Sequence, residues 1–245
     1  MACILHLETS TQVCSVAVSE DSHVIFQQED HSGPNHAERL GSMVDEALSF
    51  TDNHAIPFDA VAVSCGPGSY TGLRIGVSMA KGICYGRNLK LIAVPTLELM
   101  CVPVLLREMV EEDALLCPMI DARRMEVYTA IFDSESKVES RKSEEERVRA
   151  VVVENEESFF TPSLLGEGRG GASYYYFGDG AAKCQAVLTS PNWHYLPNIV
   201  PEAQYMGALA EDSRQSAISH QQLAYYEPFY LKEFVAAQSH VKGLK

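Results

Sequence analysis

Two short stretches of this sequence carry residue types that could bind a phosphate group. In the first, a carboxylate is followed directly by hydroxyl side chains, at Glu8, Thr9 and Ser10. A carboxylate beside hydroxyls and free turn amides can hold a magnesium–phosphate group. The same residue types also form an ordinary capped turn, so the sequence leaves both interpretations open.

The second stretch is a glycine–proline–glycine turn, containing Gly66 and Gly68, that leads from an apolar strand into a helix. Helix N-termini attract anions, and glycines allow a backbone to approach a phosphate closely. However, no Lys-Ser or Lys-Thr pair follows at the spacing of a P-loop. The turn is therefore either a phosphate contact or a tight connection between strand and helix.

The remaining nucleophilic and metal-binding residue types show no recognisable spacing. The sequence has no His-x-x-x-His, Cys-x-x-Cys or Gly-x-Ser-x-Gly pattern. We therefore predict no catalytic residue and no metal ligand. The seven cysteines, an odd number in mostly apolar contexts, indicate reduced and buried thiols in the cytoplasm.

Composition narrows the class of protein. The 245 residues carry a net charge of -14, which argues against independent nucleic-acid binding because a polyanion would be repelled. The hydrophobic content of 46% fits a globular protein with a sizeable core. No apolar run approaches the length of a transmembrane helix, and no basic segment precedes the first apolar run. We expect a cytoplasmic protein that does not contact a membrane.

The candidate phosphate residues lie in a first half that is predicted to fold as β-β-β-α-β-α-β-α. The first three strands are joined by short turns and form an antiparallel meander. Asn35 is a candidate cap for the first helix. The expected strands cover residues 3–8, 13–19, 23–28, 60–65 and 91–94, and the helices cover residues 36–50, the segment from the glycine turn to about residue 84, and residues 97–110.

The helix after the glycine turn has a small residue at every fourth position. One apolar face suits a sheet, and a second face beside it contains two glycines, each of which costs about 1 kcal/mol against alanine inside a helix. This pattern predicts a helix packed on two sides, with another backbone close to the glycines. That backbone belongs either to the same chain or to a partner. The second face consists of Gly72, Ile75, Gly76, Met79 and Ile83.

A charged stretch at residues 111–113 suggests a boundary, giving an N-terminal domain at 1–110 and a smaller C-terminal domain at 111–245. Both halves begin with a strand, a carboxylate, a turn and a second strand, which suggests a duplicated α/β architecture. The aromatic segment 225–232 is expected to pack back onto the fold. In the second half we expect strands at 115–121, 125–133, 151–153 and 174–177, an exposed charged turn at 134–149, a loop at 162–172 and a helix at 201–214.

Four motifs, in this order and spacing, resemble the bacterial TsaB (YeaZ) family. They are the stretches 5–18, 66–76, 120–128 and 227–231. The first two are shared with the catalytic paralogue TsaD, whereas the third and the short chain favour TsaB. The resemblance implies an actin-like fold of the acetate kinase/Hsc70/actin superfamily, built of two domains that each have a mixed sheet with flanking helices.

The resemblance also implies a role in making threonylcarbamoyladenosine at position 37 of tRNA. In that pathway TsaD transfers the threonylcarbamoyl group, TsaE is an associated ATPase, and TsaB is the scaffold subunit that TsaD needs. This chain would then be a non-catalytic subunit that pairs with TsaD, forms a homodimer when alone, and meets tRNA only through the complex. The alternatives are an independent kinase of the same fold and a metallopeptidase.

Two departures from TsaD support the non-catalytic interpretation. The two histidines of its metal motif are replaced here by Thr96 and Met100, which are poor ligands for iron or zinc. The glycine-rich phosphate loop of the second domain is also missing, since residues 121–124 contain no glycine. We expect no tightly bound cofactor, although ATP or ADP with Mg²⁺ at a subunit interface remains open.

In this family the first two helices bundle with those of the partner. The resemblance therefore implies that the second face of the glycine helix and part of the preceding helix form the partner interface. On this view, Gly76→Leu should abolish heterodimer formation and leave the monomer folded. The implied interface residues are Leu40, Met43, Ala47, Gly72, Ile75, Gly76, Met79 and Ile83.

Overall fold

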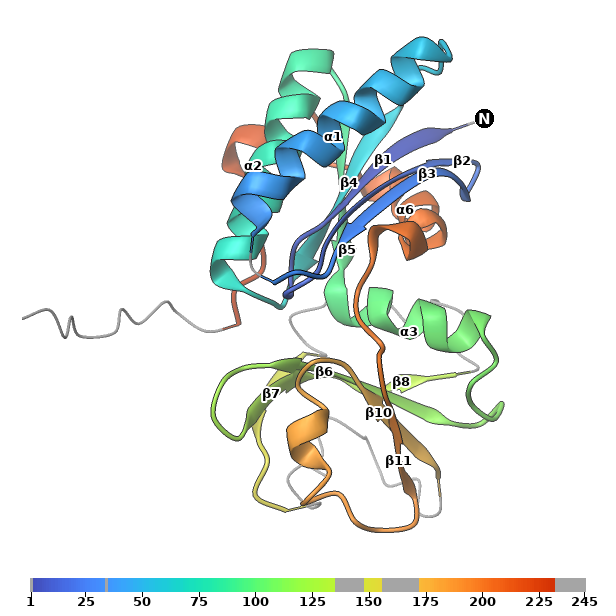
Figure 1. Ribbon diagram of the computed structural model, residues 1–245, viewed down its shortest axis with the longest axis vertical. Helices are drawn as coiled ribbons and strands as arrows, with labels where there is room; N and C mark the ends of the chain where they lie inside the picture. The colour runs from blue at the N-terminus through green and yellow to red at the C-terminus, as the bar shows by residue number, and fades with distance from the viewer. Residues whose placement is uncertain (1, 34, 135–147, 156–171, 232–245) are drawn as a thin grey trace, which may run out of the picture.

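The computed structural model describes residues 2–33, 35–134, 148–155 and 172–231. Its elements form two sheets, one above the other in Figure 1, with helices on the faces of the upper sheet and between the two sheets. Most of the predicted charged turn at 134–149 and the loop at 162–172 fall outside the described residues.

The first sheet has the strand order β3-β2-β1-β4-β5. As predicted, the first three strands form an antiparallel meander, and β4 and β5 then add parallel to β1. Parallel neighbours need a long crossover, and helices α1 and α2 supply these crossovers on one face of the sheet (Figure 1). The elements are β1 (Cys3–Glu8), β2 (Cys14–Glu20), β3 (His23–Asp30), α1 (His36–Asn53), β4 (Ala60–Gly66), α2 (Tyr70–Arg87) and β5 (Lys90–Pro95).

Both faces of this sheet are covered, which explains why β1 and β4 are apolar along nearly their whole length. Leu5 and Leu7 point toward α1 and α2 and join the core beneath those helices. Ile4 points the other way and packs with Met206 and Leu209 from the end of the chain. The strands β1 and β4 are therefore central, and the residues that follow them are held in fixed positions.

The second sheet has the order β11-β10-β6-β7-β9, with β8 paired to β6. The strand expected at 125–133 is broken into β7 and β8. Both pieces pair with β6 in one register, and the break at Ala130 falls opposite Pro118, which has no N–H to donate to the ladder. The elements are β6 (Leu115–Asp121), β7 (Glu126–Thr129), β8 (Phe132–Asp133), β9 (Arg149–Val152), β10 (Tyr174–Phe177) and β11 (Trp193–Leu196).

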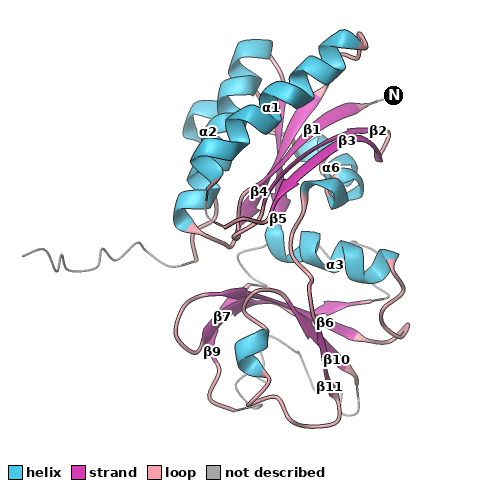
Figure 2. Ribbon diagram, viewed as in Figure 1, coloured by secondary structure: helices cyan, strands magenta, loops and turns pink. Residues whose placement is uncertain are grey.

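Helix α3 (Thr96–Leu106) lies between the two sheets, as Figure 2 shows. Leu97 and Val104 pack with Ile120 and Phe177 of the second sheet, whereas Leu99 packs with the first sheet. The helix is apolar all round, as expected for a helix buried on both sides.

After β11 the chain returns to the first sheet. The helix expected at 201–214 is replaced by three short helices. The chain then becomes extended, and Ile218 pairs with Leu91 at the edge of β5. Further on, the amide of Phe229 donates to the carbonyl of Cys65, 2.7 Å away. The division at residues 110 and 111 stays a prediction. The short helices are η3 (Ala203–Tyr205), α6 (Gly207–Asp212) and η4 (Arg214–Ser216), followed by η5 (Leu223–Tyr225).

Candidate functional site

A groove of about 840 Å³ runs along α2 where this helix faces the start of α1. Its apolar surface comes from Ala37 of α1 and from Ile75, Met79 and Ile83 of α2. Ala37 is exposed and the three larger side chains are half-buried. The groove therefore presents a continuous apolar strip to solvent, with residues at i, i+4 and i+8 along one helix.

The groove exists because α2 uses only one side to cover the sheet. Leu73, Val77 and Cys84 are fully or almost fully buried against β4 and its neighbours. The helix is fixed at both ends, since the Ser69 hydroxyl accepts a hydrogen bond from the Gly72 amide at 3.2 Å and Asn88 adopts a left-handed conformation after the last turn. The remaining side of α2 is left at the surface.

One end of the groove carries a positive charge. Arg74 donates through Nη1 to the hydroxyl of Tyr70 at 2.7 Å, and its guanidinium lies 5.2 Å from the centre of the same ring. The ring of Tyr70 in turn lies 4.9 Å from that of Tyr230. Burial raises the pKa of Tyr230 above its usual range. Arg74 is exposed at this rim, so it is available to an acidic group of a binding partner.

The structure separates the eight predicted interface residues into two sets. Three of them, Ile75, Met79 and Ile83, line the groove together. The other five are buried inside the chain. The interface assignment stays a prediction, and in this structure only the first set has access to a partner. The buried set is Leu40, Met43, Ala47, Gly72 and Gly76.

The backbone that lies close to the glycines belongs to this chain. A Cβ atom at Gly72 would meet the carbonyl oxygen of Thr9, and one at Gly76 would meet the Thr9 hydroxyl. That hydroxyl donates to the Gly72 carbonyl at 2.8 Å. Gly76→Leu would therefore disturb the fold, and our expectation that this variant leaves the monomer intact is corrected.

The carboxylate and hydroxyls after β1 are turned inward. Glu8, Thr9 and Ser10 are all buried, and Ser10 donates to Glu8 Oε1 through both its amide and its hydroxyl, each at 2.5 Å. Burial raises the pKa of Glu8, and the hydrogen bonds from Ser10 oppose that shift. Ser10 thus holds Oε1 of Glu8 as in a capped turn, whereas the buried Oε2 has no hydrogen-bond partner among the described residues.

The glycine turn is likewise filled by the chain itself. The Ser69 amide donates to the Ser10 carbonyl at 2.6 Å, and a Cβ atom at Gly68 would lie 2.5 Å from that same oxygen. Gly66 has φ +115° and faces the carbonyl oxygen of Phe229, which a Cβ atom would approach to 2.5 Å. The phosphate interpretation of both turns stays a prediction, and in this structure most of their polar groups contact this chain.

Thr96 and Met100, at the positions where the resemblance to TsaD implies metal-binding histidines, are buried at the start of α3. Met100 packs in the core shared with the second sheet. Sequence reasoning missed the part that Arg74, Tyr70 and Ala37 play in the groove. A helical projection places Arg74 and Ser78 beside Ile75, but only the fold shows that Ala37 closes the other side.

Comparison with known proteins gives a family. The family model described as "TsaD: tRNA N6-adenosine threonylcarbamoyltransferase" matches residues 24–237. The chain is 33% identical over 129 residues to the tRNA threonylcarbamoyladenosine biosynthesis protein TsaB of Bacillus subtilis strain 168, covering 53% of this chain and 54% of that one. It is 34% identical over 129 residues to the TsaB protein of Escherichia coli K12, with the same shares. The chain thus spans about half the length of the curated relatives it matches.

Two solved structures share the whole fold. "YeaZ from Pseudomonas aeruginosa" superposes with a TM-score of 0.73 at 23% identity, over 94% of this chain and 100% of that one. A second structure, of an uncharacterized protein with similarity to peptidase YEAZ from the same organism, gives 0.74 at 24% identity over 95% and 100%. The expected actin-like α/β fold, with two mixed sheets and flanking helices, is confirmed. Among the described residues, no helix is long and apolar enough to cross a membrane.

Proposed function

This chain belongs to the family described by the TsaD model and, within it, to the TsaB (YeaZ) group, and from this membership we propose its function. On that premise, the chain takes part in the biosynthesis of threonylcarbamoyladenosine at position 37 of tRNA. Its role there is that of a non-catalytic subunit, which pairs with the catalytic subunit TsaD and forms a homodimer when alone.

The observation that carries this proposal is the apolar groove along α2. Ile75, Met79 and Ile83 leave an apolar strip half-exposed on a helix that already has a complete buried face. Contiguous apolar surface on a soluble protein marks an interaction site more often than a solvated face. A strip at helical spacing suits the apolar face of a partner helix, whose acidic side chain would pair with Arg74.

The buried turns and the replaced histidines support a non-catalytic role. Glu8 and Ser10 are engaged with each other, and Phe229 covers Gly66. Thr96 and Met100 lie in the core, where they serve packing. We therefore propose no tightly bound cofactor. A contact with ATP or ADP and Mg²⁺ would require a surface completed by a partner subunit.

The net charge and the family together indicate how this chain meets its other partners. The net charge of -14 disfavours direct binding of tRNA, so we propose that tRNA and the ATPase TsaE are reached through the complex with TsaD. We place this complex in the cytoplasm, where tRNA modification takes place.

The test uses two groove variants and one control. Met79→Asp puts a charge at the centre of the strip, and Arg74→Glu reverses the charge at its exposed rim. Leu106→Asp is the control, because Leu106 is 69% exposed on α3 and does not line the groove. Each variant is measured for binding to TsaD by calorimetry, and for rescue of threonylcarbamoyladenosine in total tRNA after depletion of this protein.

We expect Met79→Asp to raise the Kd for TsaD at least about 30-fold, since a central interface residue contributes about 2 kcal/mol or more to the free energy of binding. Arg74→Glu should also weaken binding, and both variants should fail to restore the modified nucleoside. Leu106→Asp should behave as wild type. Wild-type affinity in both groove variants would rule out the groove, and an unchanged nucleoside level after depletion would rule out the pathway.

A further inference from the structure

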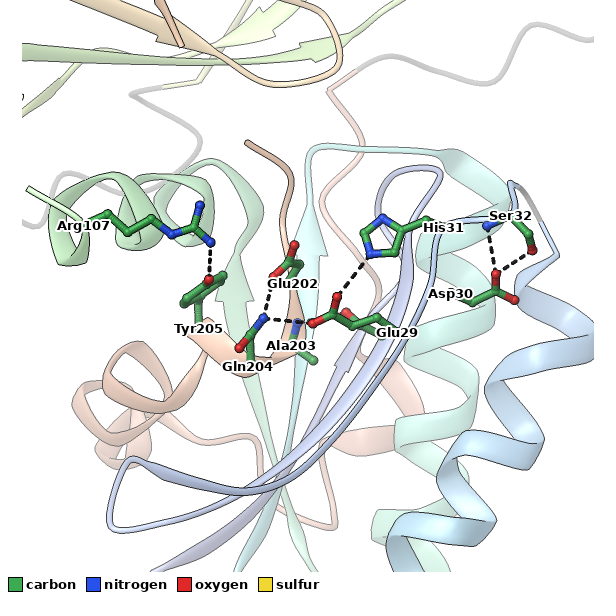
Figure 3. Close-up of polar contacts among 10 residues, drawn as sticks. Glu29, Asp30, His31, Ser32, Arg107, Glu202, Ala203, Gln204 and Tyr205 are labelled. Atoms are coloured by element: carbon green, nitrogen blue, oxygen red, sulfur yellow. Dashed lines mark hydrogen bonds and ion pairs between the residues drawn. The ribbon is translucent and has the colours of Figure 1, made fainter. Parts of the chain in front are cut away.

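Two carboxylates and an imidazole converge where the end of β3 meets the segment that returns from the second sheet. Glu29 and His31 lie two residues apart near the end of β3, and Glu202 lies just before η3 (Figure 3). The candidate ligand atoms of the three side chains all lie within 4.8 Å of one another. The spacing of Glu29 and His31 in an extended segment puts both side chains on the same side, toward Glu202.

A neighbouring amide holds both carboxylates in place. Gln204 donates through Nε2 to Glu29 Oε1 at 2.8 Å and to Glu202 Oε2 at 2.7 Å. The other oxygen of Glu29, Oε2, lies 3.1 Å from Nε2 of His31. Hydrogen bonds of this kind to ligating carboxylates orient them in metal sites. One oxygen of Glu29 and one imidazole nitrogen are therefore already directed at each other.

The returning segment is anchored at two points just after Glu202. The Ala203 amide donates to the Ser15 hydroxyl of β2 at 2.9 Å. Two residues later, the Tyr205 hydroxyl accepts a hydrogen bond of 2.6 Å from Arg107 at the end of α3. Glu202 is thus held against β3 by a rigid backbone, so the three side chains meet without a loop having to close.

The charges of the cluster favour a cation. The carboxylates of Glu29 and Glu202 stand close together, since Nε2 of Gln204 lies 2.8 Å from one and 2.7 Å from the other. Arg107 also lies within electrostatic reach of Glu202, but its guanidinium lies over the Tyr205 ring and donates to that hydroxyl. An ion placed between Glu29, His31 and Glu202 would relieve the repulsion between the two carboxylates directly.

We propose that Glu29, His31 and Glu202 bind a divalent transition-metal ion, which clamps β3 to the returning segment. One imidazole nitrogen and two carboxylate oxygens form a three-ligand set of the kind that Zn²⁺ accepts, with water completing the coordination. Binding replaces the contact between His31 and Glu29 with two metal–ligand bonds. This site is separate from the α2 groove and does not depend on the function proposed for it.

The first test is thermal unfolding of the full chain with and without ZnCl₂. At a zinc concentration about 100 times Kd, the melting temperature of the wild type should rise by about 5 to 10 °C. His31→Ala and Glu202→Gln should each weaken zinc binding at least about 10-fold in calorimetry, since even outer-shell substitutions have effects of that size. His23→Ala is the matched control, because His23 is an exposed histidine at the other end of β3.

The second test identifies the ligands by their spectrum. Co²⁺ bound by nitrogen and oxygen gives weak visible bands, whereas cysteine ligation adds a strong thiolate band in the near ultraviolet. We expect only the weak bands, and we expect His31→Ala to remove them. A thiolate band, the absence of any zinc effect on the wild type, or zinc binding that survives both substitutions would each overturn the proposal.

Discussion

The packing of Thr9 against α2 predicts opposite effects for two glycine-to-alanine substitutions in one helix. Alanine is favoured over glycine inside a helix by about 1 kcal/mol. At Gly82 a new Cβ atom meets nothing within 4 Å, so Gly82→Ala should raise the free energy of unfolding by about that amount. At Gly72 the new atom meets the carbonyl oxygen of Thr9, which belongs to the backbone and cannot rotate away.

The size of the effect at Gly72 follows from the type of neighbour. Overpacking a well-filled interior costs about 1 to 3 kcal/mol, and a rigid backbone neighbour places the cost at the upper end. Subtracting the gain in helix propensity leaves a net loss of about 2 kcal/mol. The two variants should therefore differ by about 3 kcal/mol in the free energy of unfolding, and the carbonyl oxygen of Thr9 is the main cause.

Urea unfolding followed by circular dichroism measures this difference, and it should be run at two protein concentrations. If Gly72→Ala stabilises the protein as much as Gly82→Ala, then Thr9 does not occupy the space beside Gly72. If the loss at Gly72 depends on protein concentration, a second copy covers the glycine. Either result would refute the inference that the glycines of α2 are packed within the chain.

Three further outcomes can be checked by the same unfolding method. Ser69→Ala removes the hydroxyl that accepts from the Gly72 amide and should lower the free energy of unfolding by about 1 kcal/mol, whereas Ser78→Ala, on the exposed side of α2, should not. Burial lowers the pKa of His6 to about 3, below its value in the unfolded chain. The ionisation of His6 therefore does not affect the stability of the fold above pH 6.5, and stability falls at lower pH because the unfolded chain then binds a proton that the buried imidazole does not. The wild type should therefore lose about 2 kcal/mol more than His6→Gln between pH 7 and pH 5, and equal losses would contradict a buried neutral imidazole. Hydrogen bonds from Ser32 and the ion pair with Arg39 hold the pKa of Asp30 well below its usual range. The wild type should therefore lose stability through this group as the pH falls below about 4, and Asp30→Asn should not show that loss.

The first sheet could be predicted because its signals are local. Short turns separate β1, β2 and β3, and the apolar positions of α1 recur at helical spacing around Leu40 and Val44. The break between β7 and β8 could not, because it depends on Pro118 standing opposite Ala130 in another strand. The strand β11 was missed because its four residues follow no long apolar run.

The candidate site shows the same limit. Helical spacing indicates that Gly72 and Gly76 face something close, but it cannot identify Thr9, which is distant in the sequence. The polar residue types after β1 suggest a ligand, and only the fold shows that Ser10 donates twice to one carboxylate oxygen of Glu8. Similarly, Glu29 and His31 carry no recognisable motif until the returning chain brings Glu202 beside them.

The return of the chain to the first sheet has a consequence for synthesis on the ribosome. The face of β1 that carries Ile4 is covered by Met206 and Leu209, which are translated only after the whole second sheet. Until Met206 and Leu209 are translated, the part of this face that they cover stays exposed, and exposed apolar surface of this kind favours aggregation and chaperone binding. Folding of the first sheet is therefore complete only after residues 203–231 are translated. A chain stalled on the ribosome before that point would expose the apolar surface around Ile4.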